Sequence, residues 1–178
     1  MYIKTARLEI REFTLDDVRS YYKLESIPSV ARYQYNAERT MEESKEQVGN
    51  AIEAQTITPR KVYELAVTQD ERFIGRIGAV VKDDHAVIWY SFMPAVQGKG
   101  FATEAVEAFL PELGDGLTLE IECDPRNEAS WKLGLRLGFK EMGRVEKVEF
   151  CKGEWVDSLV MQRVVPKAGV EEKSPEGE

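Results

Sequence analysis

The sequence predicts an α/β protein with a mixed sheet, and two features of the chain support that fold class. Three strand-like runs between residues 61 and 93 are separated by short polar turns, which predicts an antiparallel meander. A helical pattern and another strand-like run follow, so the chain also forms a strand–helix–strand unit. We therefore expect a central, mostly antiparallel twisted sheet (α+β in character) with helices on its faces.

The N-terminal part is expected to form one strand followed by two helices. Leu8 and Ile10 alternate with polar residues in the strand. Thr14 is placed to cap a helix that runs to about residue 27, where Pro28 would end it. Another helix is expected from Thr40, because a glutamate three residues later gives the spacing of a capping box.

The C-terminal part continues with two helices and three strands. A helix over about residues 100–113 has apolar residues at spacings of three and four, which predicts one buried face. Residues 117–123 are typical of a strand, and residues 127–138 of a short helix that ends at a glycine. Two closing strands are expected to meet at a turn formed by Lys152 and Gly153.

These elements fit one domain over residues 1–165, and the charged tail 166–178 is expected to be disordered. The net charge of −8 disfavours nucleic-acid and membrane partners and is compatible with a cationic substrate. Neither a signal peptide nor a membrane span is indicated, so we expect a cytoplasmic protein. The two cysteines lack metal-ligand spacing, and we expect reduced thiols and no metal.

A glycine-rich loop precedes the helix at residue 101, and that helix has no Ser, Thr, Asp or Asn as its N-cap. Unsatisfied amides at a helix N-terminus attract anions. Gly98 and Gly100 allow a ligand close to the backbone, and Lys99 adds positive charge. The loop alone is equally compatible with a phosphate site and with a turn capped by water. The Walker and dinucleotide-binding patterns are both absent.

The segment Gln97-x-x-Gly100-x-Ala102 resembles the acyl-CoA loop, Q/R-x-x-G-x-G/A, of the GNAT N-acetyltransferases. Three further segments resemble the branch of RimJ/RimL-like ribosomal-protein alanine acetyltransferases, in the expected order: TARLEIREFTLDD, ECDPRNEASWKLGLRLGFKEMG and CKGEWVDSLVM. Together they span about residues 5–163. The resemblance implies the GNAT fold, in which two neighbouring strands splay apart and helices cover both faces of the sheet.

The resemblance also implies acetyl-CoA as cosubstrate and direct attack by a primary amine. Backbone groups of Phe92 and Met93 would pair with the pantothenate arm, and Asn127 and Ser130 would lie near its far end. The pyrophosphate would be held by the amides of the loop and of the first helical turn, which belong to Gln97, Gly98, Lys99, Gly100, Phe101, Ala102 and Thr103.

The resemblance leaves the general base open. Val87 and Trp89 stand where related sequences carry a glutamate and a glycine, and Gly134 stands where many carry a tyrosine acid. Ser130 is therefore a candidate partner for the departing thiolate. Tyr90 is a further catalytic candidate that could face either the cleft or the core.

Glu120 and Glu122 share one face of their strand, so either carboxylate could reach the acceptor or point to solvent. Glu122 is the candidate base, and Glu120 a candidate for binding the substrate.

Tyr33 and Tyr35 lie between the first two helices, a segment that borders the acceptor site in this fold. They could cover an apolar group of the substrate or pack in the core. Trp89 should reshape the same pocket. The expected acceptor is a small-molecule amine or a protein N-terminal α-amine, and the expected assembly is a monomer or homodimer. The alternative function is a non-catalytic acyl-CoA-binding or regulatory module.

Overall fold

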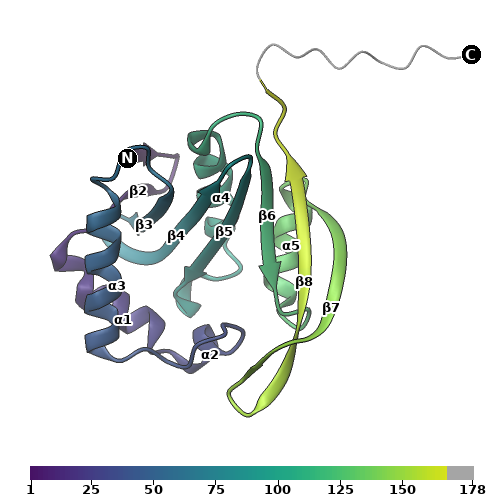
Figure 1. Cartoon of the computed structure of the whole chain (residues 1–178). Coiled ribbons are helices and arrows are strands. Elements are labelled where there is room, and N and C mark those ends of the chain that lie inside the picture. Colours follow the sequence, from purple (N-terminus) through teal and green to yellow (C-terminus); the bar gives the residue numbers. More distant parts are fainter. Residues whose placement is uncertain (168–178) are drawn as a thin grey trace, which may run out of the picture.

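The computed structural model describes residues 1–167, and its centre is an eight-stranded sheet in the order β1-β2-β3-β4-β5-β6-β8-β7 (Figure 1). The strands are β1 (Tyr2–Lys4), β2 (Glu9–Glu12), β3 (Val62–Gln69), β4 (Arg72–Lys82), β5 (His85–Phe92), β6 (Thr118–Cys123), β7 (Lys140–Cys151) and β8 (Glu154–Val164). The helices are η1 (Leu15–Asp17), α1 (Val18–Glu25), α2 (Pro28–Ala31), α3 (Met41–Ala54), η2 (Pro94–Val96), α4 (Phe101–Phe109), η3 (Leu110–Leu113) and α5 (Glu128–Arg136). Residues 1–165 thus contain every described element, and the predicted tail lies outside the described residues except for its first two.

The N-terminal part differs from the sequence-based expectation in two respects. A short edge strand, β1, precedes the first predicted strand. The helix after Thr14 begins as the 3₁₀ turn η1 and α1 already ends at Glu25. Pro28 does not end it but occupies the first turn of α2, where its missing N–H leaves no intrahelical hydrogen bond unmade. The capping box at Thr40 and Glu43 is confirmed.

The predicted mixed sheet is confirmed: β3 to β5 form an antiparallel meander, β2 pairs antiparallel with β3, and β5 pairs with β6 in parallel. That parallel ladder covers only residues 85–87 of β5 and 118–120 of β6. β5 then continues to Phe92 against β4, while β6 continues to Cys123 against β8. The two central strands therefore part beyond Val87 and Glu120, which is the splayed pair that the resemblance implied.

Helices cover both faces of the sheet. Leu65 and Val67 of β3 belong to the larger core cluster, to which α4 contributes Ala105 and Phe109. Ala66, which lies between them and points to the opposite face, belongs to the cluster of α1 and α3. The alternation of the strand thus divides the apolar core between two helical layers (Figure 1).

Trp89 lies directly opposite Gly78 in the β4–β5 ladder, and its indole packs over the glycine backbone. A Cβ atom at Gly78 would come within 2.5 Å of the indole and of the Tyr63 carbonyl oxygen. The position of the Trp89 indole therefore requires a glycine at the opposite position on the neighbouring strand β4. Gly49 of α3, in contrast, has open space around the position of a Cβ.

We predict opposite effects of the same substitution at these two glycines. Gly78→Ala should lower the free energy of unfolding by about 1–3 kcal/mol, because the added methyl overpacks the Trp89 contact. Gly49→Ala should raise it by up to about 1 kcal/mol, because a helical glycine loses more backbone entropy on folding than alanine. Urea unfolding of both variants measures the two changes, and an unchanged midpoint for Gly78→Ala would contradict the packing argument.

Candidate active site

The parting of β5 and β6 leaves backbone groups of β5 facing a gap. The Met93 N–H donates to the Ile74 carbonyl of β4 at 2.9 Å. Because donors alternate along an antiparallel ladder, the amides of Tyr90 and Phe92 point the other way, toward the gap. Of the two residues expected to pair with the pantothenate arm, Phe92 is oriented for it, while the N–H of Met93 is already used within the sheet.

The glycine-rich loop and the first turn of α4 present successive amides to one side. Within residues 1–167, the N–H groups of residues 98–103 have no hydrogen-bond acceptor, whereas the Glu104 N–H donates to the Gly100 carbonyl at 3.0 Å. Gly98 and Gly100 have φ values of 74° and 80°, which side chains other than glycine rarely adopt. A cluster of unpaired amides at a helix N-terminus is a binding site for phosphate groups.

Arg7, from the turn between β1 and β2, holds this loop from outside. Its Nη1 donates to the Lys99 carbonyl at 3.0 Å, and its Nε donates to Glu104 at 2.6 Å. The guanidinium also lies over the Phe101 ring, 4.3 Å from the centroid. Lys99 itself turns away, since its Nζ donates to the Ala95 carbonyl at 2.9 Å. Arg7 thus places a positive charge against the loop backbone, which the sequence pattern did not indicate.

A cavity of about 840 Å³ runs from this loop along the gap. Its lining includes most of the residues expected to bind the cofactor: Phe92, Gln97, Gly98, Gly100, Phe101, Ala102, Thr103, Asn127 and Ser130. Lys99 and Met93 are not among them. Arg126, Lys132 and Arg136 also line it, as does Glu128, which pairs with Lys132.

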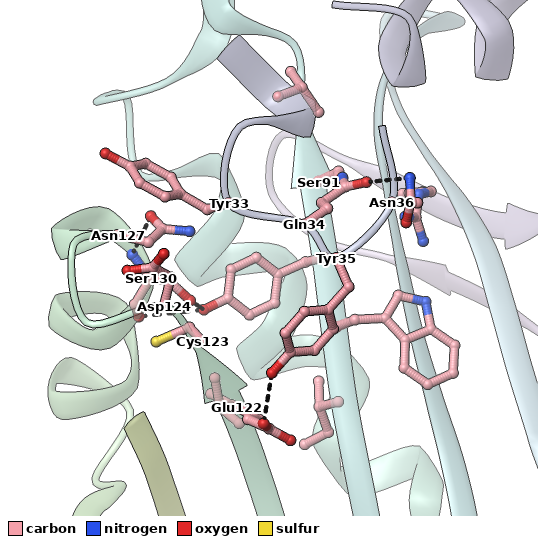
Figure 2. A pocket seen from close by; sticks show the side chains of 16 residues that line it. Tyr33, Gln34, Tyr35, Asn36, Ser91, Glu122, Cys123, Asp124, Asn127 and Ser130 are labelled. Atoms are coloured by element: carbon pink, nitrogen blue, oxygen red, sulfur yellow. Dashed lines mark hydrogen bonds between the residues drawn. The ribbon is translucent and has the colours of Figure 1, made fainter. Parts of the chain in front are cut away.

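A smaller cavity of about 290 Å³ adjoins the first and shares Tyr33, Tyr90, Ser91, Asn127 and Ser130 with it. Figure 2 shows Tyr35 reaching across this cavity to Glu122 of β6. The Tyr35 hydroxyl donates to Glu122 Oε1 at 2.8 Å, and the Ser158 hydroxyl donates to the same atom at 2.6 Å. Burial and this hydrogen bond raise the pKa of Tyr35 to about 12. Glu122 has no basic partner among the described residues, so its carboxylate is available to an incoming cation.

The structure separates the two glutamates of β6. Glu122 lies beyond the point where β5 and β6 part, and it lines the smaller cavity. Glu120 lies in the paired segment, where its Oε2 accepts from Gln162 at 2.7 Å and is 3.2 Å from His85 Nε2. Glu120 lines neither cavity. The two residues share a face as expected, but only Glu122 is near the gap.

Tyr90 faces the junction of the two cavities rather than only the core. Its hydroxyl is 2.9 Å from Ser130 Oγ and 3.2 Å from the Ser130 carbonyl oxygen. Burial raises the pKa of Tyr90 to about 12, although the Ser130 hydrogen bond acts in the opposite direction. Tyr90 therefore stays protonated and can donate. Ser130 is placed by the Asn127 side chain, which caps α5.

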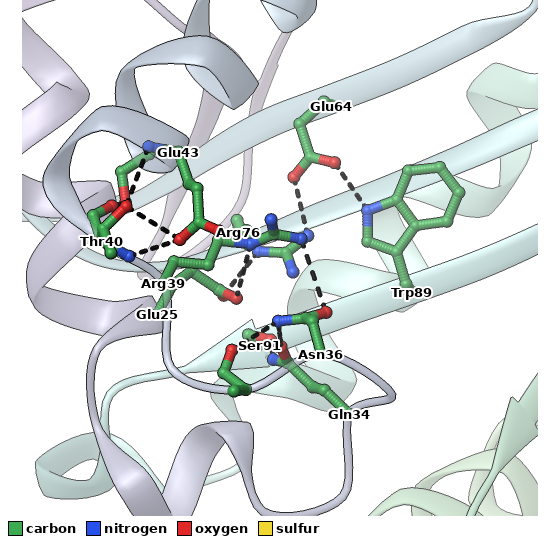
Figure 3. A network of polar contacts seen from close by, with 12 residues as sticks. Glu25, Gln34, Asn36, Arg39, Thr40, Glu43, Glu64, Arg76, Trp89 and Ser91 are labelled. Atoms are coloured by element: carbon green, nitrogen blue, oxygen red, sulfur yellow. Dashed lines mark hydrogen bonds and ion pairs between the residues drawn. The ribbon is translucent and has the colours of Figure 1, made fainter. Parts of the chain in front are cut away.

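Trp89 forms part of the floor of the smaller cavity and is fixed by a buried network of charges (Figure 3). Its Nε1 donates to Glu64 at 2.6 Å, and Glu64 also accepts from Arg76 at 3.1 Å. Arg76 Nε donates to the fully buried Glu25 at 2.7 Å. The pKa of Glu64 is raised by burial, although the charge of Arg76 acts in the opposite direction. No sequence motif marks Glu64 and Arg76, because their contacts depend on the register of β3, β4 and β5 and on the position of α1.

Among residues 1–167, no group of three or more His, Cys, Asp or Glu side chains is placed to hold a metal ion. In the same part of the chain, no helix is long and apolar enough to cross a membrane.

Comparisons with known proteins agree with the fold. A family model for the acetyltransferase (GNAT) domain matches residues 7–140. A relative from Bacillus subtilis (strain 168), YnaD, described as an uncharacterised N-acetyltransferase, is 28% identical over 166 residues, which cover 88% of this chain and 93% of that protein.

Two solved structures show the same fold at low sequence identity. An acetyl transferase from Salmonella typhimurium, described as modifying the N-terminal serine of a 50S ribosomal subunit protein, has a TM-score of 0.82 at 19% identity, with 93% of this chain and 99% of that chain covered. RimL in complex with coenzyme A has a TM-score of 0.79 at 19% identity, with 93% and 98% covered. The family model thereby confirms the resemblance to the GNAT acetyltransferases, and the two RimL-type structures share the fold. The chain belongs to the GNAT family of acetyltransferases, whose acetyl donor is acetyl-CoA.

Proposed function

We propose that this chain transfers the acetyl group of acetyl-CoA to a primary amine by direct attack, with Glu122 as the general base. The supporting observation is a carboxylate that has no basic partner within residues 1–167 and that borders a small cavity joining the gap beside β5. Acetyl-CoA supplies a thioester carbonyl to a neutral amine. The chain must therefore bind the donor, remove a proton from the amine, and stabilise the charges that develop.

Glu122 is suited to accept the amine proton. Two hydroxyl groups, from Tyr35 and Ser158, orient Oε1. With no arginine or lysine paired to it among the described residues, the carboxylate can first attract an ammonium group and then accept its proton, directly or through water. An acidic protein also favours the approach of a cationic acceptor.

The other two tasks fall to β5 and α5. The amides of Tyr90 and Phe92 are free to donate to the carbonyl oxygen as negative charge develops on it. When Tyr90 donates to Ser130 Oγ, the Ser130 hydroxyl hydrogen is free to turn toward the departing sulfur. We propose that this pair stabilises the thiolate, with Ser130 in contact and Tyr90 behind it.

Cys123 also lines the smaller cavity, which raises the possibility of an acetyl-cysteine intermediate. Burial raises the pKa of this thiol, and the thiolate is the nucleophilic form. Direct attack by the amine is therefore favoured over transfer through Cys123.

The acceptor is a small-molecule amine or a protein N-terminal α-amine. The Salmonella protein described above acts on a protein N-terminal serine, which supports the second class. The aromatic walls of the smaller cavity, from Tyr33, Tyr35 and Trp89, suit an amine with an apolar or aromatic neighbour group. We further propose that the protein acts in the cytoplasm as a monomer or homodimer, without nucleic-acid or membrane partners.

The first test is thermal unfolding with acetyl-CoA, NAD or ATP, followed by an amine screen for released CoA. Acetyl-CoA at about 100 times its Kd should stabilise the fold by about 2.7 kcal/mol. Stabilisation without turnover on any amine would support the non-catalytic alternative instead.

We predict that Gly100→Glu abolishes the stabilisation by acetyl-CoA. The substitution places a carboxylate beside the amides of the loop, at a backbone conformation that already disfavours a side chain. Gly114→Glu is the control, because Gly114 has a positive φ (101°) and open space around it but follows η3, beyond the C-terminal end of α4. Equal stabilisation of the two variants by acetyl-CoA would contradict the phosphate assignment of the loop.

We predict that Glu122→Gln lowers kcat/KM for the amine by about 10²-fold or more, since general-base catalysis is lost. Stabilisation by acetyl-CoA should persist. Glu120→Gln, two residues earlier on the same face of β6, should leave kcat/KM near that of the wild type. If both variants had the same activity, Glu122 would not be the base.

We predict that Ser130→Ala lowers kcat while the affinity for acetyl-CoA, measured by calorimetry, changes little. Tyr90→Phe should cost less, because Tyr90 acts through Ser130. With a Tyr90 pKa of about 12, the alkaline side of the wild-type profile should show no loss of this donor up to about pH 10, the ordinary tyrosine pKa. An unchanged kcat in Ser130→Ala would remove the serine from the mechanism.

A further inference from the structure

The tip of the β7–β8 hairpin contacts the segment that carries the acceptor-site tyrosines, although about 120 residues separate them (Figure 1). Lys152, at the turn, points its Nζ at three backbone carbonyl oxygens. The distances are 2.7 Å to Ala31, 2.9 Å to Arg32 and 2.6 Å to Gln34. An ammonium group has three donors, so this contact uses its full hydrogen-bonding capacity.

The segment held in this way, residues 32–37, is termed the acceptor loop below. It supplies Tyr33, Gln34, Tyr35 and Asn36 to the lining of the smaller cavity. The Gln34 side chain donates to Ser91 of β5 at 3.2 Å, while the Tyr35 hydroxyl donates to Glu122 of β6. The loop thus spans the gap between the two parted strands, and its position decides where Tyr35 meets the carboxylate.

The hairpin tip is itself anchored on the other side of the gap. Glu154 is 3.0 Å from Arg126, which is 2.6 Å from Asp124 at the end of β6. Lys152 and Glu154 therefore join the acceptor loop to the C-terminal half of the sheet.

We propose that Lys152 is a positioning residue for the amine acceptor, which holds the acceptor loop so that Tyr35 and Glu122 face the substrate. This inference rests on the proposed function. The interaction is charge-assisted and converges on one nitrogen atom. A planar guanidinium distributes its donors over a wider fork and does not reproduce that geometry. Lys152 is thus a determinant of acceptor binding that touches neither substrate.

The chain provides a closely matched control. Lys147 lies on the same hairpin and has nearly the same left-handed backbone, with φ of 51° against 49° for Lys152. Its backbone N–H donates to Asp157, but within residues 1–167 its ammonium group has no hydrogen bond or ion pair. Lys147→Met and Lys152→Met remove the same charge from the same hairpin.

Steady-state kinetics of the two methionine variants test the proposal. Lys152→Met should raise KM for the amine by about tenfold or more, the range expected for one lost charge-assisted contact. KM for acetyl-CoA should stay at the wild-type value, and Lys147→Met should resemble the wild type in both. Lys152→Arg should recover less than half of the loss. An unchanged amine KM, or equal rises in both KM values, would overturn the positioning role.

Hydrogen exchange tests the contact independently of turnover. The Gln34 backbone N–H donates to the Ala31 carbonyl oxygen, the same oxygen that Lys152 contacts. The backbone amide hydrogen of Gln34 should therefore be protected in the wild type and should exchange faster in Lys152→Met. Lys147→Met should not differ from the wild type. If the wild type acetylates no amine, the proposed function fails, and this exchange still reports whether Lys152 holds the loop. Equal exchange in all three proteins would overturn the inference.

Discussion

The early end of the β5–β6 ladder is the constraint on which the rest of the site depends. A sheet normally satisfies the backbone of a central strand on both edges, and leaving such groups unpaired in a buried position is costly. Here pairing stops at Val87 and Glu120, and the amides of Tyr90 and Phe92 face a gap instead. The same parting lets the large and the small cavity meet beside β5. The unpaired segment of β5 and β6, which destabilises the sheet, thus also creates a site for an extended ligand.

Polar contacts from distant parts of the chain hold the two halves together around this gap. Arg7 fixes the loop before α4, and Lys152 fixes the loop after α2. In both cases a cation donates to backbone carbonyl oxygens of the loop, one for Arg7 and three for Lys152, so the contact positions main chain. Such contacts leave the side chains of the loops free to face ligands.

Local features of the site were predictable from the sequence, whereas long-range pairings were not. The capless helix, its two glycines and the Asn127 cap depend on neighbouring residues, and each was identified correctly. Strand alternation also placed Glu120 and Glu122 on one face, but only the register with β5 and β8 decides which of them borders the gap. The β1 strand was missed because three residues with one partner strand carry little periodicity. The role of Lys152 was invisible for the same reason as that of Arg76: its partners lie far away in sequence.

The absence of a glutamate at position 87 finds a physical explanation in the geometry of this face of the sheet. Val87 pairs with Glu120 at the last rung before the strands part, so Val87, Trp89 and Glu122 all point to the same face. Trp89 covers Gly78 and is tied to Glu64, which fills the β5 side of that face with an indole. A carboxylate from β5 would compete with this ring for space. Glu122 approaches from the opposite strand, past the ring, and reaches the same cavity. Glu122, the proposed base, thus approaches from the other side of the gap, and direct attack by the amine does not require a carboxylate at position 87.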